Sequence, residues 1–254
     1  MIVVVLAQNT FREVVRDKVL LGTVAFGLAL MLLTRLLSPL VLGEDLRLTV
    51  DLGLSSVTGF GMLIVVMVGA SLVGKEIDRR TIYNLLSRPV ARPLYLVGKW
   101  MGLCAALWVV ALMLGAGLQA ILLWIAGTSR LLPVLSGIYM AGLELMVMAS
   151  LAVLFSALST PVLSALYTVA FFCAGSWSYD LRLFAAKFPP VLASTIEVVA
   201  GILPNLPLFN VRTLAADGLS PPPFHFAFAT LYALLYAGCV LSLAAIAFET
   251  REFK

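Results

Sequence analysis

The chain has 254 residues, of which 62% are hydrophobic and only 12% are charged, and its mean hydropathy is +1.07. A soluble domain carries about 25% charged residues, so this composition excludes a soluble globular protein and indicates an integral membrane protein. The formal net charge of +4 does not point to nucleic acid, because the basic residues flank apolar runs, as topology signals do.

The N-terminal residues 2–18 predict an amphipathic helix that lies in the membrane interface rather than across the membrane. Val4, Phe11, Val15 and Val19 recur at helical spacing, while the charged residues that follow Phe11 occupy other faces. The segment is also too short and too charged to span. We expect this elbow helix to lead directly into the first membrane span.

Six apolar segments are predicted to cross the membrane, since a span needs about 20 apolar residues. They are expected at residues 19–37, 53–73, 98–126, 134–157, 162–177 and 224–248. A polar loop is expected at 38–52, and the short link from Ser159 to Pro161 separates the fourth span from the fifth. The fold class is therefore an all-α integral membrane protein, with residues 1–254 forming a single transmembrane domain.

The longest loop, 178–223, is expected to contain one further helix between prolines. Leu192, Ile196, Val199 and Leu203 follow a helical period, with polar or small residues on the other side. The apolar stretch is short for a span, so residues 188–203 predict either a re-entrant or an interfacial helix before the sixth span.

The distribution of basic residues predicts the orientation of the chain. Most of the 17 lysines and arginines lie on the side that holds the two termini and the segment 74–97. On the other side, acidic residues offset the remaining basic ones. By the positive-inside rule, both termini and this segment face the cytoplasm, and the loop 178–223 is extracytoplasmic.

The segment 74–97 is the main concentration of charge in the chain. Residues 75–87 have helical character, and Arg88 precedes a proline, which disfavours the helical conformation. Pro93 suits the first turn of a new helix that enters the third span. The simplest alternative is a solvated basic loop that binds lipid headgroups.

At this segment the chain resembles permease subunits of the type-2 ATP-binding-cassette (ABC) transporters. The resemblance is to the broad group that includes the nitrous-oxide-reductase maturation permease. The matching stretches occur in the expected order at residues 9–20, 51–61, 74–100, 158–166, 204–212 and 248–252. The most specific is GKEIDRRTIYNLLSRPVARPLYLVGKW.

The resemblance implies a permease in a bacterial plasma (inner) membrane, in which two copies pair with two cytoplasmic ATPase subunits. The segment between the second and third spans would carry a coupling helix that docks on the ATPase. The expected docking residues in this sequence are Glu76, Arg79, Arg80, Thr81, Tyr83 and Arg88. ATP and magnesium would be bound by the ATPase partner, and no cofactor is expected in this chain.

One near-match to a phosphate-binding loop supports that division of labour. GASLVGKE at 69–76 fits GxxxxGK[ST] except at the last position, where Glu76 replaces the hydroxyl residue that would hold magnesium. It also follows an apolar span instead of a strand. We therefore expect the chain itself not to be an enzyme, and its single histidine, His225, and three cysteines form no metal-ligand set.

Glu144 is the one acidic residue deep in a predicted span. An intramembrane carboxylate is costly and is a functional candidate by default, either in a translocation path or as a proton carrier. The alternative is a structural glutamate that holds helices together by hydrogen bonds. The sequence offers no basic partner or histidine relay beside it, which gives little support to proton transfer.

Two other functions remain open at the level of sequence. A secondary transporter driven by an ion gradient usually shows internal repeats and several intramembrane ionisable groups, and this chain offers one such group. A membrane anchor that transmits force to periplasmic proteins would use the loop 178–223 to contact its partner. No motif specifies a substrate or a direction of transport.

Overall fold

The computed structural model describes residues 2–37, 45–74, 92–185, 187 and 189–249, which are helical and contain no strand. The α-helices are α1 (Ile2–Arg16), α2 (Lys18–Leu37), α3 (Asp45–Met67), α6 (Arg92–Ala126), α7 (Leu131–Leu158), α8 (Pro161–Ser176), α9 (Ser178–Ala185), α10 (Pro190–Ile202), α11 (Arg212–Ala216) and α12 (Pro223–Glu249). Short 3-10 turns are η2 (Gly69–Ser71), η3 (Gly127–Arg130) and η4 (Leu206–Phe209).

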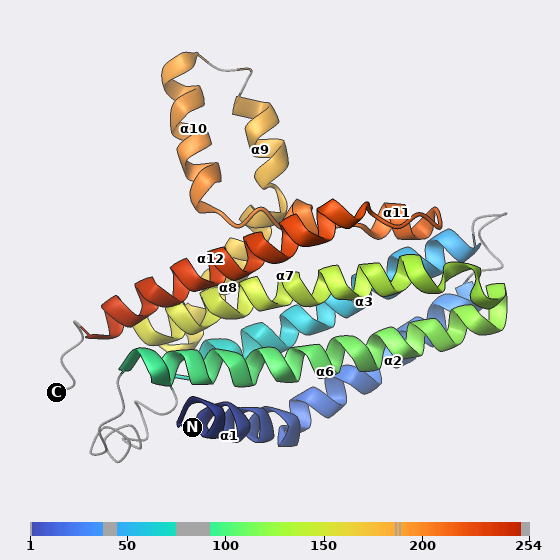
Figure 1. Cartoon of the computed structure of the whole chain (residues 1–254), viewed down its shortest axis with the longest axis horizontal. Coiled ribbons are helices and arrows are strands. Elements are labelled where there is room, and N and C mark those ends of the chain that lie inside the picture. Colours follow the sequence, from blue (N-terminus) through green and yellow to red (C-terminus); the bar gives the residue numbers. More distant parts are fainter. Residues whose placement is uncertain (1, 38–44, 75–91, 186, 188, 250–254) are drawn as a thin grey trace.

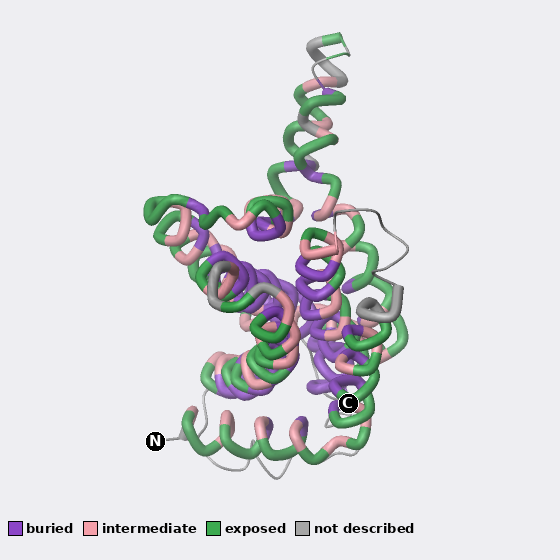
Figure 2. Tube along the Cα trace, turned by 90° about the vertical axis from the view of Figure 1, so that its right-hand side faces the viewer, coloured by how far each residue is buried: buried purple, intermediate pink, exposed green. Residues whose placement is uncertain are grey.

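Helix α7 forms the centre of the bundle. It packs against α12, α6, α3 and α8 (Figure 1). Of its most apolar 18-residue window, 78% is buried inside the protein, compared with 33% for α12. Figure 2 shows the buried residues gathered in the middle of the bundle. Most of the α7 surface therefore faces protein, while much of α12 is left for lipid.

Four helical segments in the described residues are long and apolar enough to cross a membrane, at Asp45–Ser71, Pro93–Ile125, Leu131–Leu158 and Pro223–Phe248. The number rises to six if each of two bent helix pairs counts as one span. These six differ from the predicted six. The predicted first span, 19–37, falls on Lys18–Leu33, an apolar helix that is too short to count among the membrane-crossing helices. The chain is thus a multi-pass membrane protein, and the six-span layout stays a prediction.

The two bent pairs lie where the fifth span and the long loop were expected. Helix α8 continues into α9 through a bend of 59°, and Ala193–Ile202 continues into Leu206–Ala216 through a bend of 55°. Helices α9 and α10 pack against each other and project sideways from the bundle (Figure 1). The expected helix at 188–203 therefore exists as α10, and the expected loop contains α9 and α11 as well.

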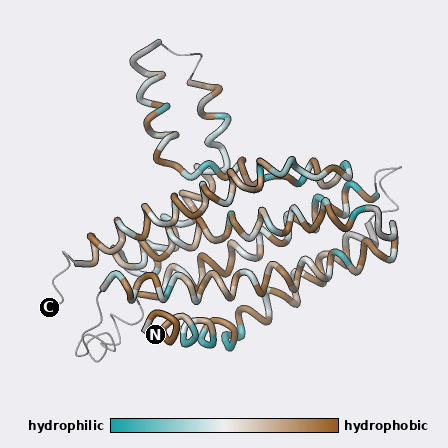
Figure 3. The backbone as a smooth tube through the Cα atoms, viewed as in Figure 1, coloured by the Kyte–Doolittle hydropathy of each residue, from teal (hydrophilic) through white to brown (hydrophobic). Residues whose placement is uncertain are grey.

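The start of α3 differs from the sequence-based expectation. Residues 45–52 were expected in a polar loop, but α3 begins at Asp45. In this first part of α3, Arg47 forms an ion pair with Asp217, at 3.6 Å between Nε and Oδ1, and Asp51 is exposed. Figure 3 shows hydrophilic residues around α11 and along α1, while the middle of the bundle is mostly hydrophobic or neutral.

Helix α1 lies against the first half of α6, and its two faces differ. Thr10 and Val14 are buried, whereas Arg12, Glu13 and Arg16 are exposed. Asp17 then caps the start of α2, since its Oδ1 accepts a hydrogen bond from the backbone N–H of Val19 at 3.0 Å. An amphipathic helix is present, as expected, and its role as an interfacial elbow stays a prediction.

Candidate functional site

The expected ATPase-docking residues lie outside the described residues. Glu76, Arg79, Arg80, Thr81, Tyr83 and Arg88 all fall within 75–91. The structure describes the two flanks of that segment, which lie at the same end of the bundle as the start of α1 and the end of α12 (Figure 1). Helix α6 begins at Arg92, with Pro93 as its second residue, in agreement with the predicted helix start.

The first flank is fixed to the core by one hydroxyl group. Ser156 of α7 is fully buried, and its Oγ accepts hydrogen bonds from the backbone N–H groups of Val73 at 3.0 Å and Gly74 at 3.2 Å. The nearby link between α7 and α8 is also tight. Pro161 occupies the first turn of α8, and Ser164 donates a hydrogen bond to the Phe155 carbonyl at 2.7 Å. The point where the charged segment leaves the bundle is thus well defined.

A second candidate region surrounds Glu144 at the middle of α7. The side chain is buried, with 6% of its surface exposed. It lines a small cavity of about 10 Å³ with Thr58 of α3 and Arg212 of α11, among other residues. Arg212 and Glu144 line this cavity together, so a basic side chain lies near the Glu144 carboxyl group. Glu144 therefore has a basic neighbour, contrary to what its position in the sequence indicated.

Sequence reasoning missed Arg212 because it follows Glu144 by 68 positions and precedes α12 in a proline-rich stretch. In the sequence, residues 204–212 stand out as part of the family resemblance. The structure turns it inward, so that Arg212 Nη1 donates a hydrogen bond to Ser55 Oγ of α3 at 3.1 Å. The sequence did carry one signal for a partly buried position, because Arg212 ends a short apolar stretch that lies between prolines.

The residues from Asn205 to Gly218 are held at several further points. The Asn205 N–H donates to the Tyr232 hydroxyl at 2.9 Å, and a ring nitrogen of His225 lies 3.0 Å from the Leu208 carbonyl oxygen. Arg130 hydrogen-bonds the Ala216 carbonyl. We call residues 205–218 the cap segment, because they cover α3 and α7 near the ends of those helices that are distant from the two termini of the chain (Figure 1).

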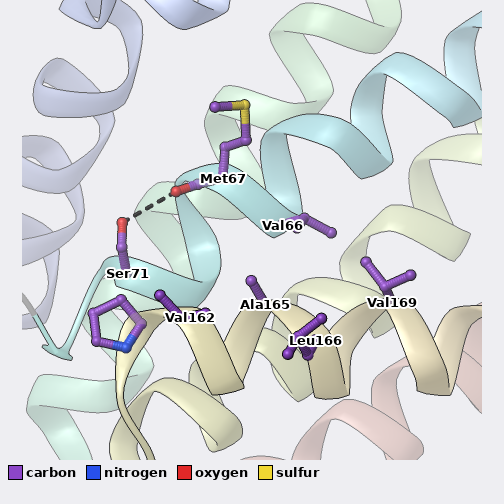
Figure 4. Close-up of a pocket in the computed structure, with 8 residues that line it drawn as sticks. Val66, Met67, Ser71, Val162, Ala165, Leu166 and Val169 are labelled. Atoms are coloured by element: carbon purple, nitrogen blue, oxygen red, sulfur yellow. Dashed lines mark hydrogen bonds between the residues drawn. The ribbon is translucent and has the colours of Figure 1, made fainter.

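A separate apolar groove of about 420 Å³ lies between α3, η2 and α8 (Figure 4). Its lining residues are Val66, Met67, Ser71, Pro161, Val162, Ala165, Leu166 and Val169. Its polar group, the Ser71 hydroxyl, donates to the Met67 carbonyl at 3.1 Å. Val162 and Leu166 are 72% and 60% exposed. A groove of this composition suits an acyl chain or another apolar surface and lacks groups for chemistry.

The described residues contain no group of three or more histidine, cysteine or acidic side chains that could hold a metal ion. Cys104, Cys173 and Cys239 are free thiols. His225 lies beside the cap segment through its contact with the Leu208 carbonyl oxygen.

The comparison with protein families decides the class of this membrane protein. Residues 4–252 match the family described as ABC-2 family transporter protein. The chain belongs to this family. It is the permease component of an ABC transporter, the membrane part that works with an ATP-binding-cassette partner. A comparison with curated proteins found no significant match. In this ABC-2 chain, the charged segment and the buried Glu144–Arg212 region are therefore regions of a transport subunit.

Proposed function

We propose that two copies of this chain form the membrane part of an ATP-driven exporter or force-transmitting complex in a bacterial inner membrane. A separate ATPase subunit would hydrolyse ATP on the cytoplasmic side, where both chain termini would also lie. The observation that carries this proposal is the charged segment between α3 and α6 in a chain that matches the ABC-2 family over nearly its whole length. Glu76, Arg79, Arg80, Thr81, Tyr83 and Arg88 are the proposed ATPase contacts.

The described flanks support this assignment physically. The segment starts directly after backbone groups that are bonded to Ser156 of the central helix α7. It ends where α6 begins, and α6 packs against α7, α3 and α1. A displacement of the segment by an ATPase would therefore act on both α7 and α6.

The test is to coexpress the chain with a candidate ABC ATPase, purify the complex and measure vanadate-sensitive ATP hydrolysis. We expect the double variant Glu76→Ala/Arg80→Ala to lower ATPase copurification by about tenfold, because interfacial charge pairs determine partner choice. The matched control is Arg16→Ala, which removes an exposed basic residue from α1. Unchanged copurification and hydrolysis in the double variant would refute the docking assignment.

A further inference from the structure

Glu144, buried at the centre of α7, and the half-buried Arg212 of α11 suggest how one end of the transporter is kept closed. We infer that Glu144 and Arg212 form a latch, in which Arg212 pins the cap segment into the bundle through the carboxylate of Glu144. The inference rests on the proposed function in one respect, since a transporter must open at the end away from its ATPase during each cycle.

The geometry of the cavity supports a water-bridged pair. The cavity joins α3, α7 and the cap segment, and Glu144, Thr58 and Arg212 supply its polar side chains. Its volume of about 10 Å³ is close to the space that one water molecule occupies. Arg212 is half-buried and is also fixed by Ser55. One guanidinium nitrogen is therefore held by α3, and the side chain lines the same cavity as Glu144 of α7.

The energetics of buried charge explain why such a pair would act as a latch. A carboxylate within the membrane is tolerated where it meets an opposite charge or lines a water-filled cavity. If the cap segment moved outward, Arg212 would leave with it and Glu144 would lose its counter-charge. Removing one partner of a buried pair is strongly unfavourable. The closed position of the cap segment is therefore favoured until water or another cation reaches Glu144.

The other charged contact of the cap segment is of a different kind. The side chains of Arg47 and Asp217 are 51% and 47% exposed, at a separation of 3.6 Å. Exposed ion pairs contribute little to stability because water screens them. This contact gives a matched control, since it joins α3 to the same segment without burying a charge.

The experiment measures how often the cap segment leaves the bundle. Ala215 is fully buried in α11, so a cysteine at Ala215→Cys reacts with a maleimide only when the segment moves. The reporter is placed in a background with Cys104→Ala, Cys173→Ala and Cys239→Ala, in nanodiscs without any ATPase. Leu214→Cys, at a position that is 39% exposed, calibrates the intrinsic reaction rate.

We expect Arg212→Gln and Glu144→Gln each to raise the labelling rate of the Ala215→Cys reporter by about tenfold or more. The double variant should return to within about threefold of the parent, because neither charge is then left alone. Arg47→Gln should change the rate by less than about twofold. Single variants that label like the parent, or a double variant that labels as fast as the product of the two single effects, would overturn the latch.

A variant that fails to fold also decides the question. If Arg212→Gln gives aggregated protein, the double variant Glu144→Gln/Arg212→Gln is examined by size-exclusion chromatography. Recovery of a monodisperse protein supports the pair, and continued aggregation contradicts it. Because no ATPase is present, these results are separate from the proposed function, which fails if an ATPase does not bind the parent protein.

Discussion

Lys99 of α6 and Glu13 of α1 form an ion pair, with 3.7 Å between Nζ and Oε2, in which the lysine side chain is 6% exposed and the glutamate side chain is 63% exposed. The ammonium group also lies 6.0 Å from the centre of the Tyr95 ring. The pair joins the N-terminal helix to the helix that begins directly after the charged segment. A displacement of α6 would therefore be transmitted to α1 through this ion pair.

The unequal burial of this pair predicts unequal effects of its two neutral variants. Glu13→Gln takes one carboxylate away from a buried ammonium group and should cost about 1 kcal/mol of stability, seen as a lower thermal midpoint. Lys99→Met leaves Glu13 in water and keeps an apolar stem in the core, so it should cost less than about 0.5 kcal/mol. The measurement is thermal unfolding in one detergent. A larger loss in Lys99→Met than in Glu13→Gln would contradict this account.

The close approach of α1 to α6 depends on glycine. A Cβ atom at Gly102 would lie 2.5 Å from the Ala7 carbonyl oxygen and 2.6 Å from Thr10 Cβ. The Ala7 carbonyl oxygen belongs to the backbone and cannot rotate away from a new methyl group. Gly102→Ala should therefore destabilise the protein by about 1–3 kcal/mol and loosen the packing of α1 against α6. The readout is the thermal midpoint together with protease cleavage within α1.

Gly22→Ala is the matched control for this substitution. Gly22 lies in the neighbouring helix α2, and nothing lies within 4 Å of the position that its Cβ would occupy. Alanine has the higher helix propensity, so this variant should be neutral or slightly stabilising. Equal losses in Gly22→Ala and Gly102→Ala would show that helix contact is not the cause.

Much of this helical pattern could be predicted from the sequence. Long apolar runs identify α6, α7 and α12 because lipid and core both select apolar side chains. The same fact hides which runs are central, since α7 and α12 have almost equal mean hydropathy, at 2.0 and 2.1, but very different burial. Only packing distinguishes them, and packing depends on shape more than on polarity.

The shared cavity of Glu144 and Arg212 could not be predicted for a related reason. Which residues meet in a membrane bundle depends on the order of the helices in space and on where the chain turns inward. Neither feature leaves a periodic pattern in the local sequence. The polar residues at 45–52 predict a loop, but Arg47 lies in α3 and contacts Asp217, which is remote in sequence. By contrast, the helix start near Pro93 was predictable, because proline has a local preference for the first helical turn.

The contact between α7 and α12 offers a further test of polar packing. The hydroxyl groups of Tyr139 and Thr230 lie 2.8 Å apart, and the Tyr139 ring also packs against Trp108 and Phe226. Hydrogen bonds between membrane helices contribute about 0.6 kcal/mol on average. Tyr139→Phe keeps the ring contacts and should lose about that amount. A double-mutant cycle with Thr230→Val measures it, and a coupling energy near zero would contradict the contact.

The hydroxyl of Ser156 gives the sharpest prediction for the origin of the charged segment. In Ser156→Ala the buried N–H groups of Val73 and Gly74 lose their acceptor. Each buried unsatisfied donor costs about 1–3 kcal/mol, so this small change should lower the thermal midpoint clearly. It should also lower ATPase stimulation, because the segment would leave the bundle from a less fixed point.

Ser242→Ala is the control, since Ser242 is exposed on α12 and its hydroxyl donates to the Gly238 carbonyl of the same helix. If Ser156→Ala and Ser242→Ala have the same midpoint and the same ATPase activity, Ser156 does not anchor the segment.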